Sequence, residues 1–147
     1  MAGVSRAVVY DAIVNEPDLI ALGFDTGSVL VGYDGEQRPS DKMFMVLRWE
    51  QQDVTFRGDD SQIARGPWHL TIWVHMYREF STDFVRIDDV IDILDRILVE
   101  IVDAAGGDGR SVSVIEPEGH SRDLRDDGYQ TICRSASYRV LSRVTAS

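Results

Sequence analysis

The spacing of the apolar residues changes within residues 68–102, and this change constrains the fold more than any other feature of the chain. Residues 68–77 alternate strictly, as in a strand with one apolar face. That face consists of Trp68, Leu70, Ile72, Val74 and Met76. Further along, apolar residues recur at helical spacing: Ile87, Val90, Ile91, Leu94, Ile97, Leu98 and Ile101. A strand followed by a long amphipathic helix predicts a helix layer packed on a sheet layer.

The remaining segments predict shorter elements. Residues 5–22 are predicted to form two short helices, with Pro17 in the first turn of the second. Strands are predicted at residues 27–33, 43–50, 111–115 and 129–143, with a turn at Asp127 and Gly128 before the last strand. Residues 51–66 and 116–127 are polar and are interpreted as loops. The long helix is expected to be capped by Thr82 or Asp83 and stopped by the glycines of residues 106–109.

These elements predict a single α+β domain over residues 1–147. We expect a mostly antiparallel sheet of four to five strands, a short N-terminal helix, and one long amphipathic helix packed on one face. A chain of 147 residues buries enough surface to form a core without a metal ion or disulfide bonds. Cys133 is the only cysteine, so no internal disulfide forms. We expect neither a signal peptide nor a membrane span.

The charge of the chain limits its partners. The net charge is −10, from 15 basic and 25 acidic residues. Affinity for nucleic acid depends on clustered Lys and Arg, so this balance argues against a protein that grips nucleic acid. Arg134, Arg139 and Arg143 on the last predicted strand leave room for a local basic face.

No motif in the chain predicts catalysis or a cofactor. His69 and His75 share a strand face, but about 20 Å separates them, too far to bind one metal ion. Cys133 has no histidine placed beside it by a motif and is expected to be a buried, inert thiol. The chain has no nucleophile elbow, phosphate loop or dinucleotide fingerprint. We therefore expect no enzyme activity, no metal and no cofactor.

An acidic row on the long helix has three possible interpretations. Asp88, Asp92 and Asp95 fall within a narrow arc, with Asp103 beside them. The row is expected to form a solvated face, to pair with Arg residues of a neighbouring subunit, or to hold a divalent cation, in decreasing order of weight. Val99 interrupts this face and is a candidate subunit contact.

Trp73 and Tyr77 lie on the more polar face of the strand at residues 68–77. They are expected either to pack against loops or the N-terminal helix, or to form an interface patch.

The order of these segments resembles that of the tail terminator proteins of bacteriophages with long, non-contractile tails. The resemblance covers about residues 5–143. It rests on residues 8–14 (VVYDAIV), 44–49 (FMVLRW), 70–77 (LTIWVHMY), 87–102 (the long helix) and 129–140 (YQTICRSASYRV). Residues 116–127 depart from the family pattern.

The resemblance implies a structural role in the virion, at the junction between tail and neck. Such proteins form hexameric rings that cap the tail tube, end its polymerisation and join the tail to the head, and DNA passes through the ring. The implied partners are other copies of the chain, the major tail tube protein and a head-completion or neck protein, with no membrane. The candidate contact residues are Trp73, Tyr77, Asp92, Asp95, Val99, Arg134 and Arg139. The acidic helix face and the Arg-bearing last strand are candidate complements, and residues 51–66 are a candidate for reaching a neighbour or the tube.

Three other functions fit the same sequence. The first is another neck or head–tail connector protein. The second is a small-ligand-binding or enzymatic α+β domain that uses a cleft beside Trp73 and Tyr77. The third is a regulatory adaptor that pairs through a sheet edge.

Overall fold

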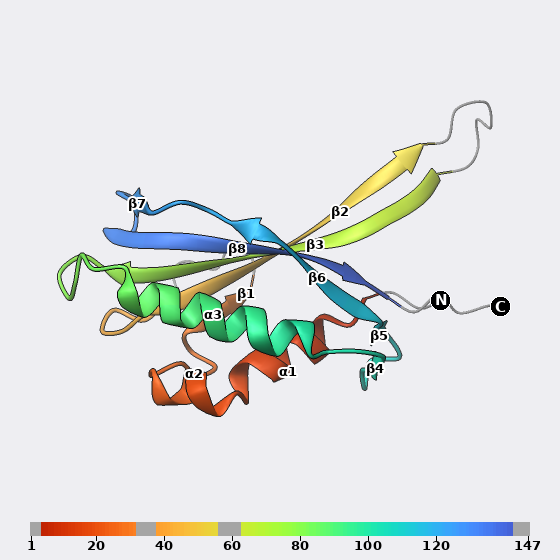
Figure 1. The fold of residues 1–147 in the computed structure, drawn as a ribbon, viewed down its shortest axis with the longest axis horizontal. Coiled ribbons are helices and arrows are strands. Elements are labelled where there is room, and N and C mark those ends of the chain that lie inside the picture. The colour runs from red at the N-terminus through yellow and green to blue at the C-terminus, as the bar shows by residue number, and fades with distance from the viewer. Residues whose placement is uncertain (1–3, 32–37, 56–62, 143–147) are drawn as a thin grey trace.

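The computed structural model describes residues 4–31, 38–55 and 63–142, and in this part of the chain the fold is α+β. Its main sheet is mixed and six-stranded, with helices gathered on one face (Figure 1). The helices are α1 (Arg6–Val14), α2 (Pro17–Ala21) and α3 (Val85–Val99). The sheet strands are β1 (Val29–Val31), β2 (Phe44–Thr55), β3 (Ile63–Tyr77), β6 (Val114–His120), β7 (Leu124–Asp126) and β8 (Thr131–Leu141). A separate two-stranded sheet consists of β4 (Ala104–Ala105) and β5 (Ser111–Val112).

The sheet order is β1-β2-β3-β8-β6, and β7 also pairs with β8. β1 runs parallel to β2, whereas the other pairs of the main sheet are antiparallel. The prediction of an α+β fold is confirmed, and so are the two N-terminal helices. The predicted count of four to five strands is wrong, because the segment interpreted as a loop at residues 116–127 contributes strands.

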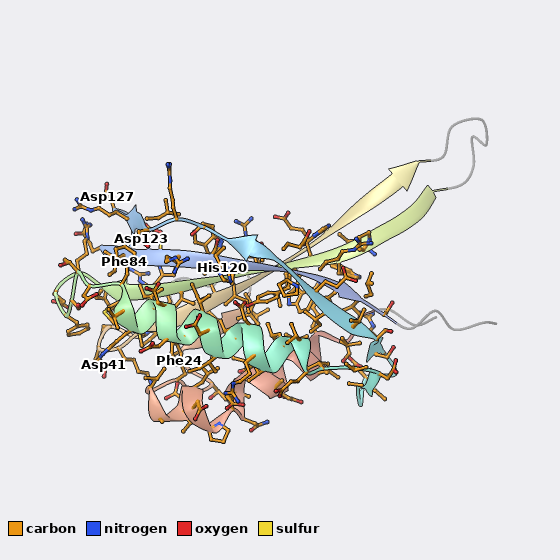
Figure 2. All side chains as sticks on the ribbon, viewed as in Figure 1. Phe24, Asp41, Phe84, His120, Asp123 and Asp127 are labelled. Carbon is orange, nitrogen blue, oxygen red and sulfur yellow. The ribbon has the colours of Figure 1, made fainter. Side chains whose placement is uncertain are left out.

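The core lies between the sheet and α3. Leu70, Ile72 and Val74 of β3 are fully buried, as the alternation predicted. The apolar stripe of α3 faces them, with these buried residues: Ile87, Val90, Ile91, Leu94, Ile97 and Leu98. Phe24, in the segment between α2 and β1, is buried on the same helical side of the sheet (Figure 2). Each of the two predicted periodicities therefore marks a buried surface.

The long helix is shorter at its C-terminal end than predicted. Asp83 accepts a hydrogen bond of 3.0 Å from the backbone N–H of Val85, so it satisfies one donor of the first turn, although Phe84 occupies the N-cap position. The helix ends at Val99, before the glycines of residues 106–109. The expected glycine stop is therefore wrong. Gly106 instead lies against Ser5, the N-cap of α1, where a Cβ atom would clash with the serine hydroxyl.

The interpretation of residues 51–66 as a long loop is wrong. β2 continues to Thr55 and β3 begins at Ile63, with backbone pairing at Asp53–Arg65, Val54–Ala64 and Thr55–Ile63. Pairing of β3 with β8 ends at Trp68, and β1 pairs only with residues 45–47 of β2. The backbone of residues 52–55 and 63–66 is therefore a two-stranded ribbon that projects beyond the rest of the sheet (Figure 1). We call this ribbon the β2–β3 arm.

The base of the β2–β3 arm carries a contact with the helical layer. Trp49 of β2 and Trp68 of β3 meet edge to face, with 6.4 Å between ring centroids. The guanidinium of Arg6, in the first turn of α1, lies 5.6 Å from the Trp49 ring and 4.9 Å from the Trp68 ring. Cation–π attraction therefore links the start of α1 to both strands at the point where the arm leaves the body.

The segment at residues 116–127 forms an interrupted edge strand. β6 pairs with β8 from Val114 to His120, with a bulge between Pro117 and Gly119, and β7 resumes the pairing from Leu124. In the gap, Ser121 exchanges two backbone-directed hydrogen bonds of 2.9 Å with Ser135. The predicted turn at Asp127 and Gly128 is confirmed. The predicted strand ends at residues 32–33 and 143, and residues 56–62 of the predicted loop, lie outside the described residues.

Candidate functional site

The sheet face opposite the helices is the candidate site. No described helix covers this face, which we call the open face (Figure 1). Side chains alternate between the two faces along each strand, and the register brings paired residues of neighbouring strands to the same face. The open face carries Phe44, Val46 and Arg48 on β2; His69, Thr71, Trp73, His75 and Tyr77 on β3; and Cys133, Ser135, Ser137 and Arg139 on β8.

An aromatic cluster surrounds His75 on the open face. The His75 ring stacks on Phe44 with centroids 4.8 Å apart and an interplanar angle of 6°. Tyr129 meets the same two rings edge to face, 5.9 Å from Phe44 and 5.4 Å from His75. The guanidinium of Arg38 lies 4.5 Å from the Tyr129 ring centroid, and the Tyr77 hydroxyl donates a 2.5 Å hydrogen bond to the carbonyl of Pro39. The cluster therefore fixes the orientation of the imidazole.

His75 is a buried and neutral histidine. Its side chain is 4% exposed, and Nδ1 lies 2.8 Å from the Thr131 hydroxyl. Burial lowers the pKa of His75 from 6.5 to about 4; Asp126 opposes this shift, while Arg38 adds to it. The imidazole is therefore uncharged at neutral pH.

A pocket of about 360 Å³ opens beside His75. Its lining residues are Val46, Arg48, Trp73, His75, Leu124, Arg125, Asp126, Tyr129 and Cys133. β2, β3 and β8 provide the floor, and β7 with the turn after it provides one wall. Pockets of 300–1,000 Å³ with mostly apolar walls are typical of small-molecule sites.

Cys133 has no features of a nucleophile. Its side chain is 3% exposed, and burial, with a smaller contribution from Asp126, raises the pKa of the thiol to about 11. The thiol is therefore protonated at neutral pH. The expectation of a buried cysteine is confirmed.

On the helical side, Arg134 of β8 links α3 to the segment between β6 and β7. The Arg134 guanidinium donates to Asp88 on α3 and lies 3.6 Å from Asp123. Its Nε also donates a hydrogen bond of 3.2 Å to the carbonyl of Ser121. Arg134 side-chain exposure is 20%, so the ion pair with Asp88 is partly shielded from solvent. Arg134, predicted to meet a neighbouring subunit, is therefore engaged within its own chain.

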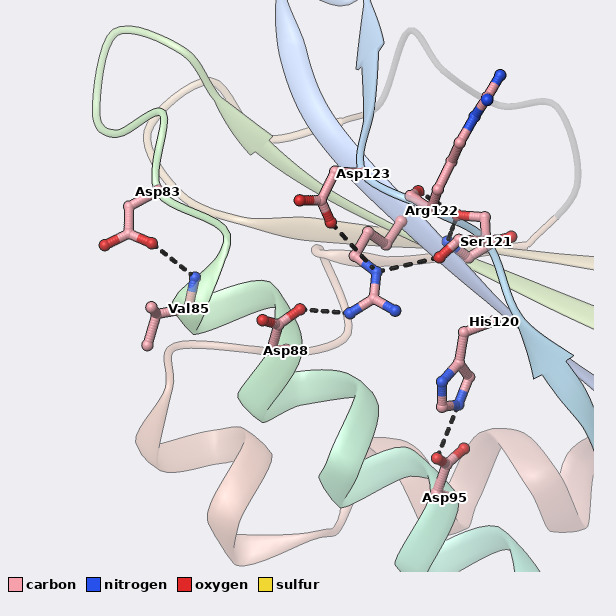
Figure 3. A network of polar contacts seen from close by, with 10 residues as sticks. Asp83, Val85, Asp88, Asp95, His120, Ser121, Arg122 and Asp123 are labelled. Atoms are coloured by element: carbon pink, nitrogen blue, oxygen red, sulfur yellow. Dashed lines mark hydrogen bonds and ion pairs between the residues drawn. The ribbon is translucent and has the colours of Figure 1, made fainter.

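Asp95 forms a second link between α3 and the sheet. One carboxylate oxygen accepts a hydrogen bond of 2.6 Å from the Tyr138 hydroxyl. The other lies 2.8 Å from Nε2 of His120 (Figure 3). Burial, with Asp95 as a second cause, raises the pKa of Tyr138 above its ordinary value. His120 and Asp123 both lie along the β6–β7 edge (Figure 2).

The acidic row is therefore divided. Asp88 and Asp95 point to partners on the sheet, whereas Asp92 is exposed and Asp103 lies beyond the helix. Within the described residues, no three side chains of the metal-binding types converge on one point. The acidic side chains of this row therefore do not form one continuous face exposed to solvent.

The predicted contact residues occupy two different faces. Trp73, Tyr77 and Arg139 lie on the open face, where Trp73 lines the pocket and Tyr77 does not. The remaining residues, Asp92, Asp95, Val99 and Arg134, lie on or against α3. Asp92, Val99 and Arg139 are exposed.

Sequence reasoning missed the cluster of Phe44, His75, Tyr129 and Arg38. The available signal was His75 itself, which shares a strand face with Trp73 and Tyr77. Its partners come from segments that only the pairing of β2, β3 and β8 brings together.

Comparison of the chain with models of protein families finds no match, and comparison with curated proteins finds none either. In the described part of the chain, none of the helices has the length and apolar character needed to cross a membrane.

Proposed function

We propose that the chain is a structural virion protein, not an enzyme, that forms a ring on the tail tube, ends tube growth and joins tail to head. Its place in the virion is the tail–neck junction, and its partners are further copies of itself in a hexamer, the major tail tube protein and a head-completion or neck protein. The support from sequence is the resemblance given above. The observation that carries the proposal is the β2–β3 arm.

The β2–β3 arm is a ribbon that lacks support from the rest of its own sheet. Beyond Gln51 and Trp68, the described strands β2 and β3 pair only with each other. An isolated two-stranded ribbon is at best marginally stable in water, and unpaired strand edges readily accept further strands or side chains. A neighbouring molecule that packs on the arm would supply this missing support.

A closed ring requires that kind of asymmetric contact. In a ring, one surface of each subunit meets a different surface of the next. The arm on one subunit and the body of its neighbour form such a pair. The net charge of −10 suits a ring through which DNA passes without being held.

The sequence predicted a contact between the acidic helix face of one subunit and the Arg-bearing last strand of its neighbour, and this proposal changes the residues of that contact. Arg134 pairs with Asp88 and Asp123 in its own chain, so it is not the complement of a neighbour. Asp92, Val99 and Arg139 are exposed and remain candidate contacts. A different neck or connector protein would use the same arm against another partner.

Shortening the arm tests the proposal. Replacing residues 54–64 by Asn-Gly would close the hairpin with a two-residue turn directly after the Asp53–Arg65 pair. We expect this variant to keep its circular dichroism spectrum and a cooperative thermal transition, because the core residues that the structure describes belong to other parts of the chain. We expect it to lose ring formation in solution mass measurements and to leave tubes of the cognate tail tube protein uncapped in electron micrographs.

Two outcomes would contradict the proposal. If the shortened variant caps tubes as often as the unmodified chain, the arm is not the contact. If the unmodified chain neither forms rings nor binds tube ends, the terminator function itself is wrong. Tubes that are capped but not joined to heads would favour a different member of the neck.

A further inference from the structure

The pocket on the open face contains a polar atom that its surroundings do not use. His75 Nδ1 is engaged by Thr131, but no described residue provides a hydrogen-bond partner for Nε2. His75 is 4% exposed, lines the pocket, and is held in orientation by stacking on Phe44. Because the ring is neutral, Nε2 offers one hydrogen bond, as a donor or an acceptor according to the tautomer.

The walls of the pocket favour a flat, apolar ligand. Trp73 and Tyr129 present aromatic rings, and Val46 and Leu124 present aliphatic groups. Flat aromatic molecules bury apolar area between such walls at low cost in conformational entropy. A cavity of about 360 Å³ has room for a molecule of about two fused rings.

The charges around the pocket favour an anion, in contrast to the net charge of the chain. Arg48 and Arg125 belong to the lining, and Arg38 lies over the Tyr129 ring beside it. Arg48 also lies 3.6 Å from the exposed carboxylate of Glu50, so a ligand carboxylate would share this guanidinium with Glu50. Among the described lining residues the one acid is Asp126, whose Oδ1 accepts a hydrogen bond of 3.0 Å from the backbone N–H of Tyr129. Guanidinium groups are well suited to binding a carboxylate.

We propose that this pocket binds a small aromatic carboxylate, with its rings against Trp73 and Tyr129, a polar ring substituent on His75 Nε2 and its carboxylate toward Arg48. The inference is independent of the proposed assembly, because the pocket lies on the body and not on the β2–β3 arm.

Calorimetric titration with three matched probes tests the chemistry. The probes are 6-hydroxy-2-naphthoate, the same acid without the hydroxyl group, and the corresponding hydroxynaphthyl methylammonium cation. We expect the hydroxy acid to bind most tightly. In NMR spectra of the same titration, it should shift the indole N–H resonance of Trp73 more than those of the other tryptophans. Loss of one hydrogen bond corresponds to roughly a tenfold weaker Kd for the acid without the hydroxyl group.

Variants locate the site. His75→Phe keeps a flat ring on Phe44 but removes Nε2, and we expect it to bind the hydroxy acid about tenfold more weakly. His69→Phe is the matched control, because His69 lies on the same face of the same strand but does not line the pocket. Val46→Trp places a large side chain in the pocket and leaves His75 in the sequence. We expect this variant to remain folded and to lose binding.

Each contrary result overturns a stated part of the inference. Binding that survives Val46→Trp places the ligand elsewhere. An ammonium probe that binds as tightly as the acid refutes the preference for an anion. No detectable binding of any probe at millimolar concentration refutes the site. None of these results bears on ring formation, which the arm variant tests separately.

Discussion

Tyr138 donates a hydrogen bond of 2.6 Å to Asp95, and this bond joins the centre of β8 to the middle of α3. Tyr138 is fully buried, and the carboxylate of Asp95 is 30% exposed. The bond therefore spans the interface between the two layers of the fold, next to the contact of Asp95 with His120.

Removal of this hydroxyl group should destabilise the domain moderately. Tyr138→Phe keeps the ring in the core but leaves one oxygen of Asp95 without its donor, so we expect a loss of about 1–2 kcal/mol in the free energy of unfolding. Urea denaturation monitored by circular dichroism provides the measurement. Tyr10→Phe, at a half-buried position of α1, is the control and should change stability by about 0.5 kcal/mol or less. Equal losses in both variants would show that the bond contributes nothing specific.

The buried imidazole of His75 should make the domain sensitive to acid. The pKa of His75 is about 4 in the folded chain, against an ordinary value of 6.5, so below pH 6.5 the unfolded chain binds a proton that the folded chain does not bind. Stability from this group is complete above pH 6.5 and declines as the pH falls toward 4, by about 3 kcal/mol in total.

Unfolding free energies of the unmodified chain and of His75→Phe between pH 8 and pH 4 test this dependence. We expect the unmodified chain to lose more stability over this range than the variant, since carboxylates contribute equally to both. His69→Phe serves as the control for loss of a histidine from β3. Parallel pH profiles for the unmodified chain and His75→Phe would exclude the explanation.

The contact of Arg134 with Asp88 should be measurable as a coupling. A double-mutant cycle with Arg134→Met and Asp88→Asn should give a coupling energy of about 1 kcal/mol, because the pair is partly shielded from solvent. Arg139→Met, at an exposed position of the same strand, should change stability by about 0.5 kcal/mol or less. A coupling near zero would mean that solvent screens the pair completely.

Substitutions at two exposed positions of α3 can distinguish effects on folding from effects on ring assembly. Asp92 and Val99 are exposed, so we expect Asp92→Lys and Val99→Glu each to change the unfolding free energy of the monomer by about 0.5 kcal/mol or less. If this face meets a neighbour in the ring, both variants should reduce the fraction of rings in solution mass measurements. Unchanged ring formation in both would remove this helix face from the interface.

The elements that the sequence predicted well are those with one buried side. The alternation at residues 68–77 and the helical spacing from Ile87 to Leu98 each reflect a face packed in the core. The ends of β2 and β3 were missed because a ribbon outside the body has no second layer to impose alternation. The start of β6 falls within the strand predicted at residues 111–115, but its continuation over residues 116–120 was missed, because Glu116, Pro117 and Gly119 lie on an exposed, bulged edge, where polar residues and bulges are common.

The contacts of the candidate site were harder to predict for a different reason. Helical geometry places Asp88 and Asp95 on one side of α3, but it does not indicate which side chains they meet. Arg134 and Tyr138 reach them because the register of β8 brings alternate residues to the helical side. The aromatic cluster around His75 depends in the same way on strand pairing between distant segments.

The contact of Arg6 with Trp49 and Trp68 gives the β2–β3 arm a mechanical character. The same strands run from the arm into the centre of the sheet, with a shift in register between Gln51 and Asp53, and the side chain of Arg6 in α1 contacts them close to this point. A molecule that packs on the described part of the arm would therefore act on the sheet and on α1 together, so its docking would also set the orientation of the whole subunit.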